Sequence, residues 1–340
     1  YSLKEVELEA TVKAMQMLPP YQIKNLTHLY LAFGIVRDNK IDVRHFKYFK
    51  DYLKMFREWN PELVIELSTG GGGAGGHGEA TKPENIEGFV ESTMEAVEEL
   101  DLDGIDCDWE FPCNRGDYEE KAQHVELMKR YREALDDYGK KHDKKMWLTI
   151  AAAAWDKYLE NVDIPAITPY LDCIHIMTYD LRDAAWEDNF TGHHTNLYPP
   201  KDAHYDESIV GCVKKYQDQG VPLDKIVIGS GFYSHRWDNV PDVNHGMNQP
   251  MTTPMIYGPG YDTLRNLYET SDNYTKYWDD DAKACWLFNG NSFITYDDPK
   301  SMRYKAQYVK ESGVRGIMYW EHSSDSTGEL FRALAEELKK

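Results

Sequence analysis

Three carboxylates lie two residues apart in the segment 103–112, which reads DGIDCDWEFP; they are Asp106, Asp108 and Glu110. In a β-strand, side chains two apart point to the same face, so the three acids are expected to share one face and the apolar residues between them the other. Close carboxylates cannot all ionise cheaply, so at least one should hold a proton near neutral pH. A carboxylic acid in that state can act as a general acid.

The elements that position these acids follow from seven short apolar runs, which alternate with amphipathic stretches. The runs are Leu26–Phe33, Leu63–Ser68, Gly104–Phe111, Met146–Ala153, Cys173–Tyr179, Ile226–Tyr233 and Gly316–Trp320. The predicted helices are 43–58, 84–100, 117–142, 205–219 and 299–312, with Asp117 as the N-cap of the third. Strands that alternate with helices in this way are typical of parallel β/α units.

This alternation predicts an α/β chain, a (β/α)8 TIM barrel in a single domain, 1–340. A closed barrel needs an eighth strand, and we expect residues 1–2 to be the stump of a first strand with a helix over 3–17 behind it. The segment 238–296 interrupts the alternation with prolines, glycines and aromatic residues. It is predicted to be a small insertion between strands 7 and 8 that forms one wall of a cleft.

Composition narrows the classes of partner. The 340 residues are 41% hydrophobic and 28% charged, as in ordinary globular proteins, and 13% are aromatic, which fits a large core or a groove lined for stacking equally well. The formal net charge of −20 argues against nucleic acid and anionic membrane surfaces as partners. No apolar run is long enough to predict a membrane span.

The chain has five cysteines and no Cys-x-x-Cys pair, which predicts neither a zinc ribbon nor a disulfide framework. Cys107 and Cys173 are predicted to be buried thiols.

Polar residues also end several of the other predicted strands. Ser68 precedes Gly70 and Gly71, the pair Tyr179-Asp180 follows the run that begins at Cys173, and further ends carry Tyr233 and Trp320. In a β/α barrel the active site lies at the carboxyl ends of the strands, so these side chains are expected to converge with the acids.

The sequence resembles glycoside hydrolase family 18, the chitinases and their relatives, in four motifs that occur in the family's order. The motifs are Asp103-Gly104-Ile105-Asp106-x-Asp108-x-Glu110, Ser68-x-Gly70-Gly71, Met177-x-Tyr179-Asp180, and Trp320 within Gly316–Glu321. Together they cover about residues 27–325. The resemblance implies a substrate-assisted retaining mechanism, an exception to the usual two-carboxylate scheme.

By this resemblance, Glu110 protonates the glycosidic oxygen and the substrate's own 2-acetamido oxygen is the nucleophile. Asp108 orients the acetamido N–H, and Asp106 shares a proton with Asp108 as a coupled pair. Tyr179 hydrogen-bonds the acetamido group. Asp103 is expected to be structural, and neither a metal nor a cofactor is expected.

The resemblance also implies a set of sugar-contacting residues, with Trp320 as the apolar floor beneath the sugar. These residues are Asp180, Trp320, Met177, Phe33, Tyr233, Arg236 and Trp186. Met177 and Phe33 fit the core equally well, and Trp155, Trp186 and Trp237 fit either stacking platforms or packing. Ser68, Gly70 and Gly71 are expected to pack the barrel, and His193-His194 to lie in a solvated loop.

Two departures from the family pattern leave points open. Many chitinases carry Trp directly after the paired glycines of the third strand, where this chain has Gly72. The family's Tyr-x-Arg after strand seven appears here as Tyr233-Ser234-His235-Arg236, so either His235 or Arg236 takes the role of the arginine.

The function expected from the resemblance is hydrolysis of β-1,4 linkages in N-acetylglucosamine polymers such as chitin and chito-oligosaccharides. The alternatives are an endo-β-N-acetylglucosaminidase acting on N-glycans, an inert glycan-binding barrel, which the acid Glu110 disfavours, and a metal-dependent barrel enzyme. The expected partner is an N-acetylglucosamine-containing oligo- or polysaccharide, with the protein a monomer. A secreted or cell-surface location is expected, although no leader is visible in a chain that starts at Tyr1.

Overall fold

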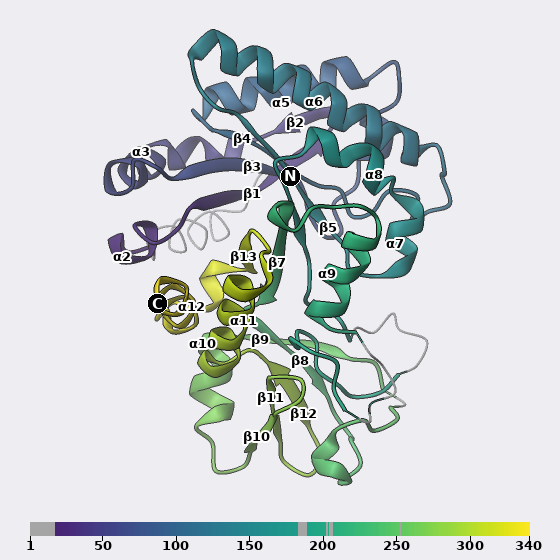
Figure 1. Ribbon diagram of the computed structural model, residues 1–340, viewed down its shortest axis with the longest axis vertical. Helices are drawn as coiled ribbons and strands as arrows, with labels where there is room; N and C mark the ends of the chain where they lie inside the picture. The colour runs from purple at the N-terminus through teal and green to yellow at the C-terminus, as the bar shows by residue number, and fades with distance from the viewer. Residues whose placement is uncertain (1–17, 183–188, 202, 204–206, 252) are drawn as a thin grey trace. The chain divides into compact units, whose positions relative to one another are not determined.

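The computed structural model describes residues 18–182, 189–201, 203, 207–251 and 253–340 (Figure 1). The chain divides into two compact units, one of Tyr1–His175 with Gln219–Val221 and one of Ile176–Asp218 with Pro222–Lys340. The first strand predicted at residues 1–2 and the helix predicted at 3–17 lie outside the described residues.

The first unit is built on a sheet whose strands follow the order β6-β5-β4-β3-β1-β2. The strands are β1 (His28–Arg37), β2 (Lys40–Asp42), β3 (Val64–Gly70), β4 (Gly104–Asp108), β5 (Trp147–Ala152) and β6 (Cys173–Ile176). The pairs β1–β3, β3–β4 and β4–β5 are parallel, and β2 returns antiparallel to β1. Parallel strands need crossover connections, and helices supply them.

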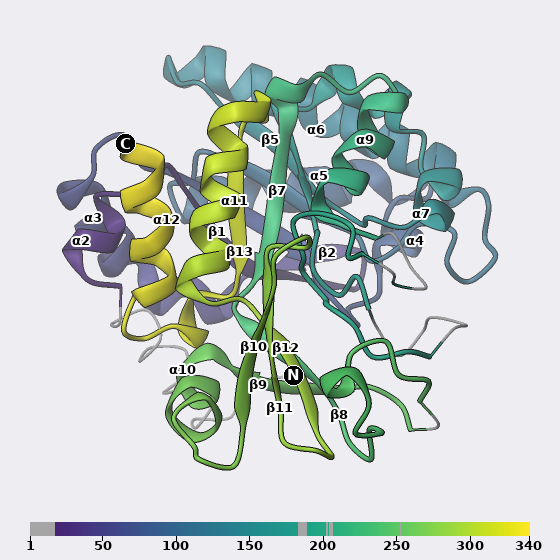
Figure 2. The same cartoon turned by 60° about the horizontal axis from the view of Figure 1, so that its bottom comes forward.

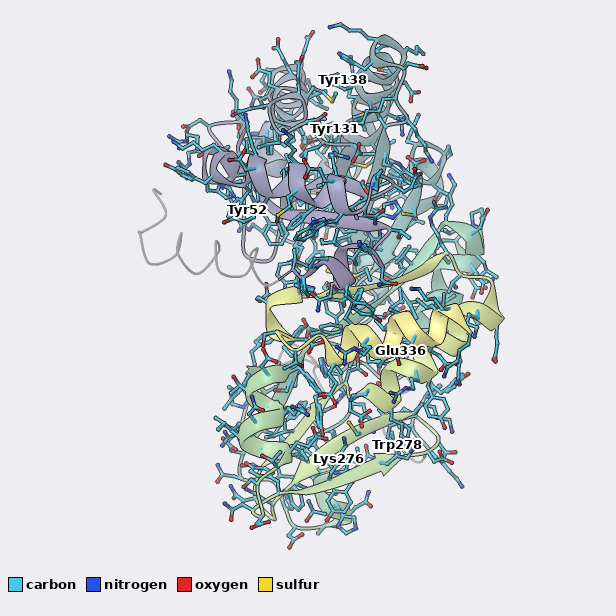
Figure 3. All side chains as sticks on the ribbon, turned by 90° about the vertical axis from the view of Figure 1, so that its left-hand side faces the viewer. Tyr52, Tyr131, Tyr138, Lys276, Trp278 and Glu336 are labelled. Carbon is cyan, nitrogen blue, oxygen red and sulfur yellow. The ribbon has the colours of Figure 1, made fainter. Side chains whose placement is uncertain are left out.

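The helices of the first unit lie between these strands. They are α2 (Pro20–Ile23), η1 (Arg44–Phe49), α3 (Lys50–Trp59), α4 (His77–Ala80), α5 (Ile86–Glu99), α6 (Glu120–His142), α7 (Asp156–Asn161), α8 (Ile164–Ile167) and η2 (Thr168–Tyr170). Helices α5 and α6 run side by side (Figures 1 and 2). Tyr131 of α6, labelled in Figure 3, is fully buried, and its hydroxyl lies 3.1 Å from that of Thr93 on α5.

The predicted start of α6 was wrong. The helix begins at Glu120, and the carboxylate of Asp117 accepts a hydrogen bond from the Glu119 N–H in the turn before it. An aspartate that bonds the backbone two residues on stabilises a turn rather than capping a helix.

The second unit contains a parallel pair, β7 (Ile226–Gly231) and β13 (Gly316–Trp320). Its helices are α9 (Ile209–Asp218), η3 (Leu223–Lys225), η4 (Asn244–Gly246), α10 (Tyr261–Leu264), the π-helix η5 (Arg265–Glu269), α11 (Pro299–Ser312), η6 (His322–Ser324) and α12 (Glu329–Lys339). Helix α11 matches its predicted bounds because its sequence marks both ends: Asp298 and Ser301 form a capping box, and Gly313 adopts φ 84° after the last turn.

An antiparallel sheet lies between β7 and β13 in the sequence, in the order β10-β11-β12-β8-β9. Its strands are β8 (Tyr233–Trp237), β9 (Ile256–Gly260), β10 (Thr275–Asp279), β11 (Ala284–Phe288) and β12 (Phe293–Tyr296), visible at the bottom of Figure 2. Trp237 is buried among Trp286, Phe288 and Phe293, so it packs the core rather than offering a free stacking face. Trp278, labelled in Figure 3, lies at the outer strand β10 with its ring stacked on Tyr304.

A buried charge pair joins the end of this sheet to the parallel strands. Lys305 of α11 is fully buried, and its ammonium contacts the carboxylate of Asp297, directly after β12. The hydroxyl of Ser230 on β7 donates to the same carboxylate oxygen at 2.5 Å, and the Lys305 ammonium donates to Thr195 at 2.8 Å. Buried charges are tolerated when they are paired and hydrogen-bonded in this way.

All seven predicted strands are present, although the run at 104–111 is too long because β4 ends at Asp108. The five predicted helices are also found, the first divided into η1 and α3. Within the described ranges, no helix is both long and apolar enough to cross a bilayer.

The glycines after β3 differ in what a side chain would meet, which gives a stability test. A Cβ on Gly70, at φ 104°, would lie 2.3 Å from the Asp108 carbonyl oxygen, whereas one on Gly72 would find nothing nearer than 3.5 Å. We expect Gly70→Ala to lower the free energy of unfolding by about 1–3 kcal/mol or more, the range for a strained backbone. The matched Gly72→Ala should change it far less. Urea unfolding of both variants measures the difference, and equal losses would contradict the close approach of β3 to β4.

Candidate active site

The acids predicted from the sequence lie at the end of β4. Asp106 and Asp108 are buried and share a face of the strand, and the half-buried Glu110 comes two residues later in the following turn. The side chains of Ile105 and Cys107 are buried on the opposite face. The alternation expected from the sequence therefore holds within the strand.

Asp106 is the most heavily hydrogen-bonded of the three acids. In the parallel register Ser68 of β3 and Thr149 of β5 flank it. The Ser68 hydroxyl donates to Oδ2 at 2.7 Å, and the Thr149 hydroxyl donates to Oδ1 at 2.7 Å. On β6, His175 Nδ1 lies 3.2 Å from the same Oδ1. Ser68 thus contributes a specific hydrogen bond to the acid, beyond the packing expected of it.

The pKa values of the two aspartates move in opposite directions. Burial alone would raise the pKa of Asp106, but hydrogen bonds from His175, Ser68 and Thr149 outweigh it and lower that pKa. Burial raises the pKa of Asp108 well above its usual range, and the charges of Glu110 and Asp106 raise it further. A proton shared by this coupled pair is therefore held by Asp108 in preference to Asp106.

A second layer of polar groups lies beneath Asp106. Glu66 of β3 is fully buried, and its Oε2 lies 3.1 Å from the Thr149 hydroxyl. Burial raises its pKa well above the usual range. Because the single proton of Thr149 goes to Asp106, a protonated Glu66 is the donor that completes the contact. On the other side, the Tyr30 hydroxyl lies 2.9 Å from His175 Nε2.

Sequence reasoning missed Glu66, Thr149 and His175. A usable signal was present, because Glu66 and Ser68 are two apart on β3, as Asp106 and Asp108 are on β4. Polar residues at period two on neighbouring buried strands indicate a polar interior face. Only the strand register, however, brings Thr149 opposite Asp106.

The face of the segment opposite the acids ends in Trp109, which is held by two buried imidazoles. The ring of His77 stacks on it with centroids 5.4 Å apart, and His124 of α6 meets it edge-on at 5.7 Å. Burial lowers the pKa of His77 to about 3, helped by the nearby His124, and lowers the pKa of His124 to about 4. Both rings are therefore neutral at neutral pH.

The space in front of Glu110 is bordered by the glycine loop after β3. A Cβ on Gly72 would lie 3.5 Å from Glu110 Oε2, so this position faces the acid without covering it. A Cβ on Gly71, at φ 91°, would meet the ring of Phe33 at 2.7 Å. Phe33 therefore packs against the glycine backbone, which gives it a structural contact whether or not it meets a sugar.

Asp103 and Trp155, two further residues of the first unit, contact neighbouring residues of the fold. Asp103 accepts a hydrogen bond from the Ile65 N–H at 2.7 Å and pairs with Arg57 at 2.9 Å and Lys144 at 2.8 Å, which fits the structural role expected of it. Trp155 is half-buried, and its ring packs edge-on against Phe111 at 4.7 Å.

In the second unit, the residues predicted around Asp180 come together. The Tyr233 hydroxyl donates to Asp180 Oδ1 at 2.5 Å, and the Tyr257 hydroxyl of β9 lies 3.4 Å from Oδ2. The ring of Tyr179 meets that of Tyr233 at 6.2 Å. Tyr257 was not predicted; its place on the inserted sheet concealed it.

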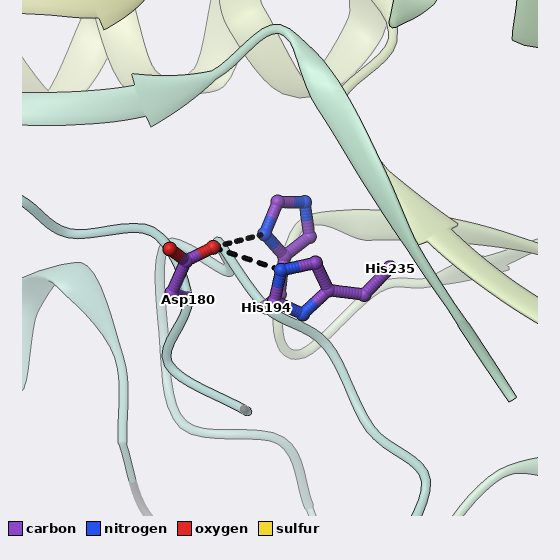
Figure 4. Close-up of side chains that lie close together, drawn as sticks. All are labelled: Asp180, His194 and His235. Carbon is purple, nitrogen blue, oxygen red and sulfur yellow. Dashed lines mark ion pairs between the residues drawn. The ribbon is translucent and has the colours of Figure 1, made fainter. Parts of the chain in front are cut away.

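The structure distinguishes His235 from Arg236. His235 Nε2 lies 2.8 Å from Asp180 Oδ1 (Figure 4), whereas Arg236 Nε donates to Asp238 at 2.7 Å. Neighbouring residues of a strand point to opposite faces, so only one of the two can face Asp180. His235 therefore lies next to Asp180, and the assignment of the arginine's role to either residue stays a prediction.

The prediction of a solvated loop at His193-His194 was wrong, since both side chains are fully buried. His193 Nε2 lies 3.3 Å from Asp279, and the His194 ring stacks on that of His235. Burial, together with the charge of His235, lowers the pKa of His194 to about 4. Aromatic neighbours from the inserted sheet cover this loop, and no local sequence pattern shows that cover.

The remaining predicted sugar contacts are placed as follows. Trp320 ends β13 with 37% of its surface exposed, a large apolar ring left open to solvent. Met177 is half-buried directly after β6. Trp186 lies outside the described residues.

The sequence profile of the glycosyl hydrolases family 18 matches residues 5–325 of this chain. The chain belongs to this family. Chitinase A1 of Niallia circulans is 32% identical over 311 residues, 84% of this chain and 44% of the relative. Endochitinase of Manduca sexta is 25% identical over 89% of this chain and 59% of its own length. The chain thus spans about half the length of these curated relatives.

Solved structures agree with this membership. A family 18 N-acetylglucosaminidase from Paenibacillus barengoltzii superposes with a TM-score of 0.92 at 39% identity, covering 96% of this chain and 97% of that one. Chitinase ChiW from Paenibacillus sp. str. FPU-7, described as cell-surface-expressed, gives a TM-score of 0.87 at 35% identity over 94% of this chain and 31% of its own. These likenesses confirm the predicted fold class, a (β/α)8 barrel with an insertion between strands 7 and 8.

The buried imidazoles beside Trp109 make stability depend on pH. The folded pKa values of His77 and His124 lie below the ordinary 6.5, so the unfolded chain takes up protons that the folded chain excludes as the pH falls from 6.5 towards 4. Each group should remove up to about 1.4 kcal/mol of stability per pH unit in that window. In urea unfolding between pH 7 and 4, His124→Gln should show a shallower decline than the wild type. Exposed His142→Gln is the control; if both variants decline like the wild type, His124 is not buried in its neutral form.

Proposed function

We propose that this chain hydrolyses β-1,4 linkages of chitin and chito-oligosaccharides by the substrate-assisted retaining mechanism of its family. The observation that carries the proposal is that Ser68, Thr149 and His175 contact the Asp106 carboxylate, which lowers its pKa, while the pKa of Asp108, two residues before Glu110, is raised. The names of the relatives, chitinase, endochitinase and N-acetylglucosaminidase, support the substrate class.

In the first step, Glu110 gives its proton to the glycosidic oxygen as the bond to the anomeric carbon breaks. The substrate's 2-acetamido oxygen attacks that carbon and forms an oxazolinium-type intermediate. Asp108 orients the acetamido N–H, and the negative charge of the coupled pair Asp106 and Asp108 stabilises the positive charge of the intermediate. Glu110, now a carboxylate, takes a proton from the water that opens the intermediate and so returns to its starting state.

The sugar contacts in this proposal follow the motifs that the chain shares with its family. Tyr179 hydrogen-bonds the acetamido group, Asp180 and Tyr233 contact the same sugar, and the exposed ring of Trp320 stacks beneath it. Met177, Phe33, Arg236 and Trp186 complete the proposed set of sugar contacts. We further propose that residues 1–340 act as one catalytic domain in which 238–296 is the insertion.

The alternatives differ in what they require. An endo-β-N-acetylglucosaminidase acting on N-glycans would use the same acids and is distinguished by its products. An inert glycan-binding barrel does not require the general acid Glu110. A metal enzyme using the three acids as ligands is disfavoured because Asp106 already accepts hydrogen bonds from Ser68, Thr149 and His175.

The proposed setting is extracellular. Chitin is a polymer met outside most cells, and one solved relative is described as cell-surface-expressed. We propose a secreted or cell-surface enzyme that acts as a monomer on N-acetylglucosamine-containing oligo- or polysaccharide.

Removal of the general acid tests the mechanism. Glu110→Gln should lower kcat on N-acetylglucosamine oligomers by at least about 10²-fold, because general acid catalysis contributes that much or more. Oligomer binding, measured by calorimetry, should persist. Glu119→Gln, an exposed glutamate near the start of α6, is the matched control and should keep full activity. Unchanged turnover in Glu110→Gln would refute the assignment.

The nucleophile is tested through the substrate. Oligomers of N-acetylglucosamine should be cleaved, and the same oligomers without their acetyl groups should not, because the acetamido oxygen does the attacking. Asp108→Asn should also slow the acetylated substrate. Product analysis on defined oligomers and on an N-glycan, side by side, separates chitinase from endoglycosidase activity; efficient cleavage of plain glucose polymers would exclude the acetamido mechanism.

A further inference from the structure

A second chemical cluster lies in the second unit, formed by Asp180, His194 and His235 (Figure 4). The three come from separate segments: the turn after β6, the loop before α9, and strand β8. One ligand atom from each lies within 4.8 Å of the other two. Across the described ranges, this is the one group of three or more His, Cys, Asp or Glu side chains that meets this spacing.

The two imidazoles of the cluster are short of hydrogen-bond partners. Both ring nitrogens of His194, a fully buried side chain, have none. His235 Nε2 approaches Asp180 Oδ1 to 2.8 Å without the alignment of a hydrogen bond. Buried polar atoms are nearly always partnered, and a ligand bound at this cluster would give all three nitrogens a partner.

The neighbours of the cluster prepare it to bind a cation. His235 Nδ1 lies 2.7 Å from the Arg182 carbonyl oxygen and donates to it, so Nε2 is the ring nitrogen directed towards Asp180. The Tyr233 hydroxyl in turn donates to Asp180. Metal-binding histidines and carboxylates typically have such outer hydrogen bonds, which fix the tautomer and the orientation of the ligand.

The donor set indicates which ion would bind. Two imidazoles and one carboxylate, buried and without thiolates, form a set that zinc enzymes use with a fourth position left open. Ligand atoms of a tetrahedral zinc ion lie about 3.3 Å apart, given bond lengths of about 2.0–2.1 Å. Asp180 Oδ1 is 2.8 Å from His235 Nε2 and 3.8 Å from His194 Nδ1. These distances bracket that value.

Binding of a single ion by both histidines requires one change in side-chain orientation. The rings of His194 and His235 are stacked, with centroids 4.3 Å apart and planes 26° from parallel, so one ring must turn for both to point at a single ion. A turn of the His194 ring breaks no hydrogen bond, although the ring is buried and has to move within its packing.

We propose that Asp180, His194 and His235 form a binding site for Zn²⁺ that is separate from the general acid. Binding should also inhibit hydrolysis, because the ion occupies the carboxylate proposed to hold the sugar. This second consequence rests on the proposed function, whereas binding itself does not.

The direct test is calorimetric titration of the full chain, stripped with EDTA and dialysed, with zinc chloride. We expect one saturable site per chain. Replacing a ligand should weaken binding by at least about tenfold, since loss of an outer partner alone removes 10–100-fold. His194→Gln is the test variant. His193→Gln, the neighbouring buried histidine that pairs with Asp279, is the matched control and should stay within about twofold of the wild type. Co²⁺ in place of Zn²⁺ should give the visible absorption of a tetrahedral site in the wild type and lose it in His194→Gln.

The outcomes are distinct. No saturable binding by the wild type, or equal affinities in the two variants, overturns the site and leaves Asp180 and His235 as an internal ion pair. Thermal melting of each variant shows whether it is folded; if His194→Gln is not, His235→Gln replaces it. If Zn²⁺ binds but Glu110→Gln hydrolyses like the wild type, the proposed mechanism fails and the metal site stands. If hydrolysis depends on Glu110 and Zn²⁺ does not bind, the reverse holds.

Discussion

The ionised state of Asp106 is the constraint around which the first unit is arranged. A buried carboxylate is stable only if hydrogen bonds replace the water it has lost. Ser68, Thr149 and His175 supply them from three neighbouring strands, so the register of the sheet and the charge of the acid depend on each other. Because Asp106 keeps its charge, Asp108 keeps its proton. The glycine backbone that lets β3 approach β4 serves the same arrangement.

Much of this could be predicted from local sequence, for identifiable reasons. Asp106 and Asp108 follow the period of two that a strand imposes, and Asp298, Pro299 and Gly313 mark the ends of α11. The predicted start of α6 was wrong because aspartate is a residue type that often caps helices, whereas Asp117 stabilises a turn. Local signals fail where two conformations use the same residue types.

Other features depend on contacts that sequence does not show. His193 and His194 look like polar loop residues, and only the aromatic neighbours of the inserted sheet bury them. The sequence around Thr149 gives no sign of a role, and only the strand register places this residue opposite Asp106. The choice between His235 and Arg236 likewise required the face of β8. In each case the deciding partner is far away along the chain.

The charge pair of Lys305 and Asp297 bears on how this fold can change during evolution. Asp297 sits at the junction where the inserted sheet returns to the barrel, and its partner lies on the barrel's own helix α11. A deletion that removed Asp297 together with the insertion would leave the buried ammonium of Lys305 without its partner. Loss of one member of a buried pair destabilises a protein by about 3–5 kcal/mol. The exit of the insertion must therefore be inherited together with the helix that follows it.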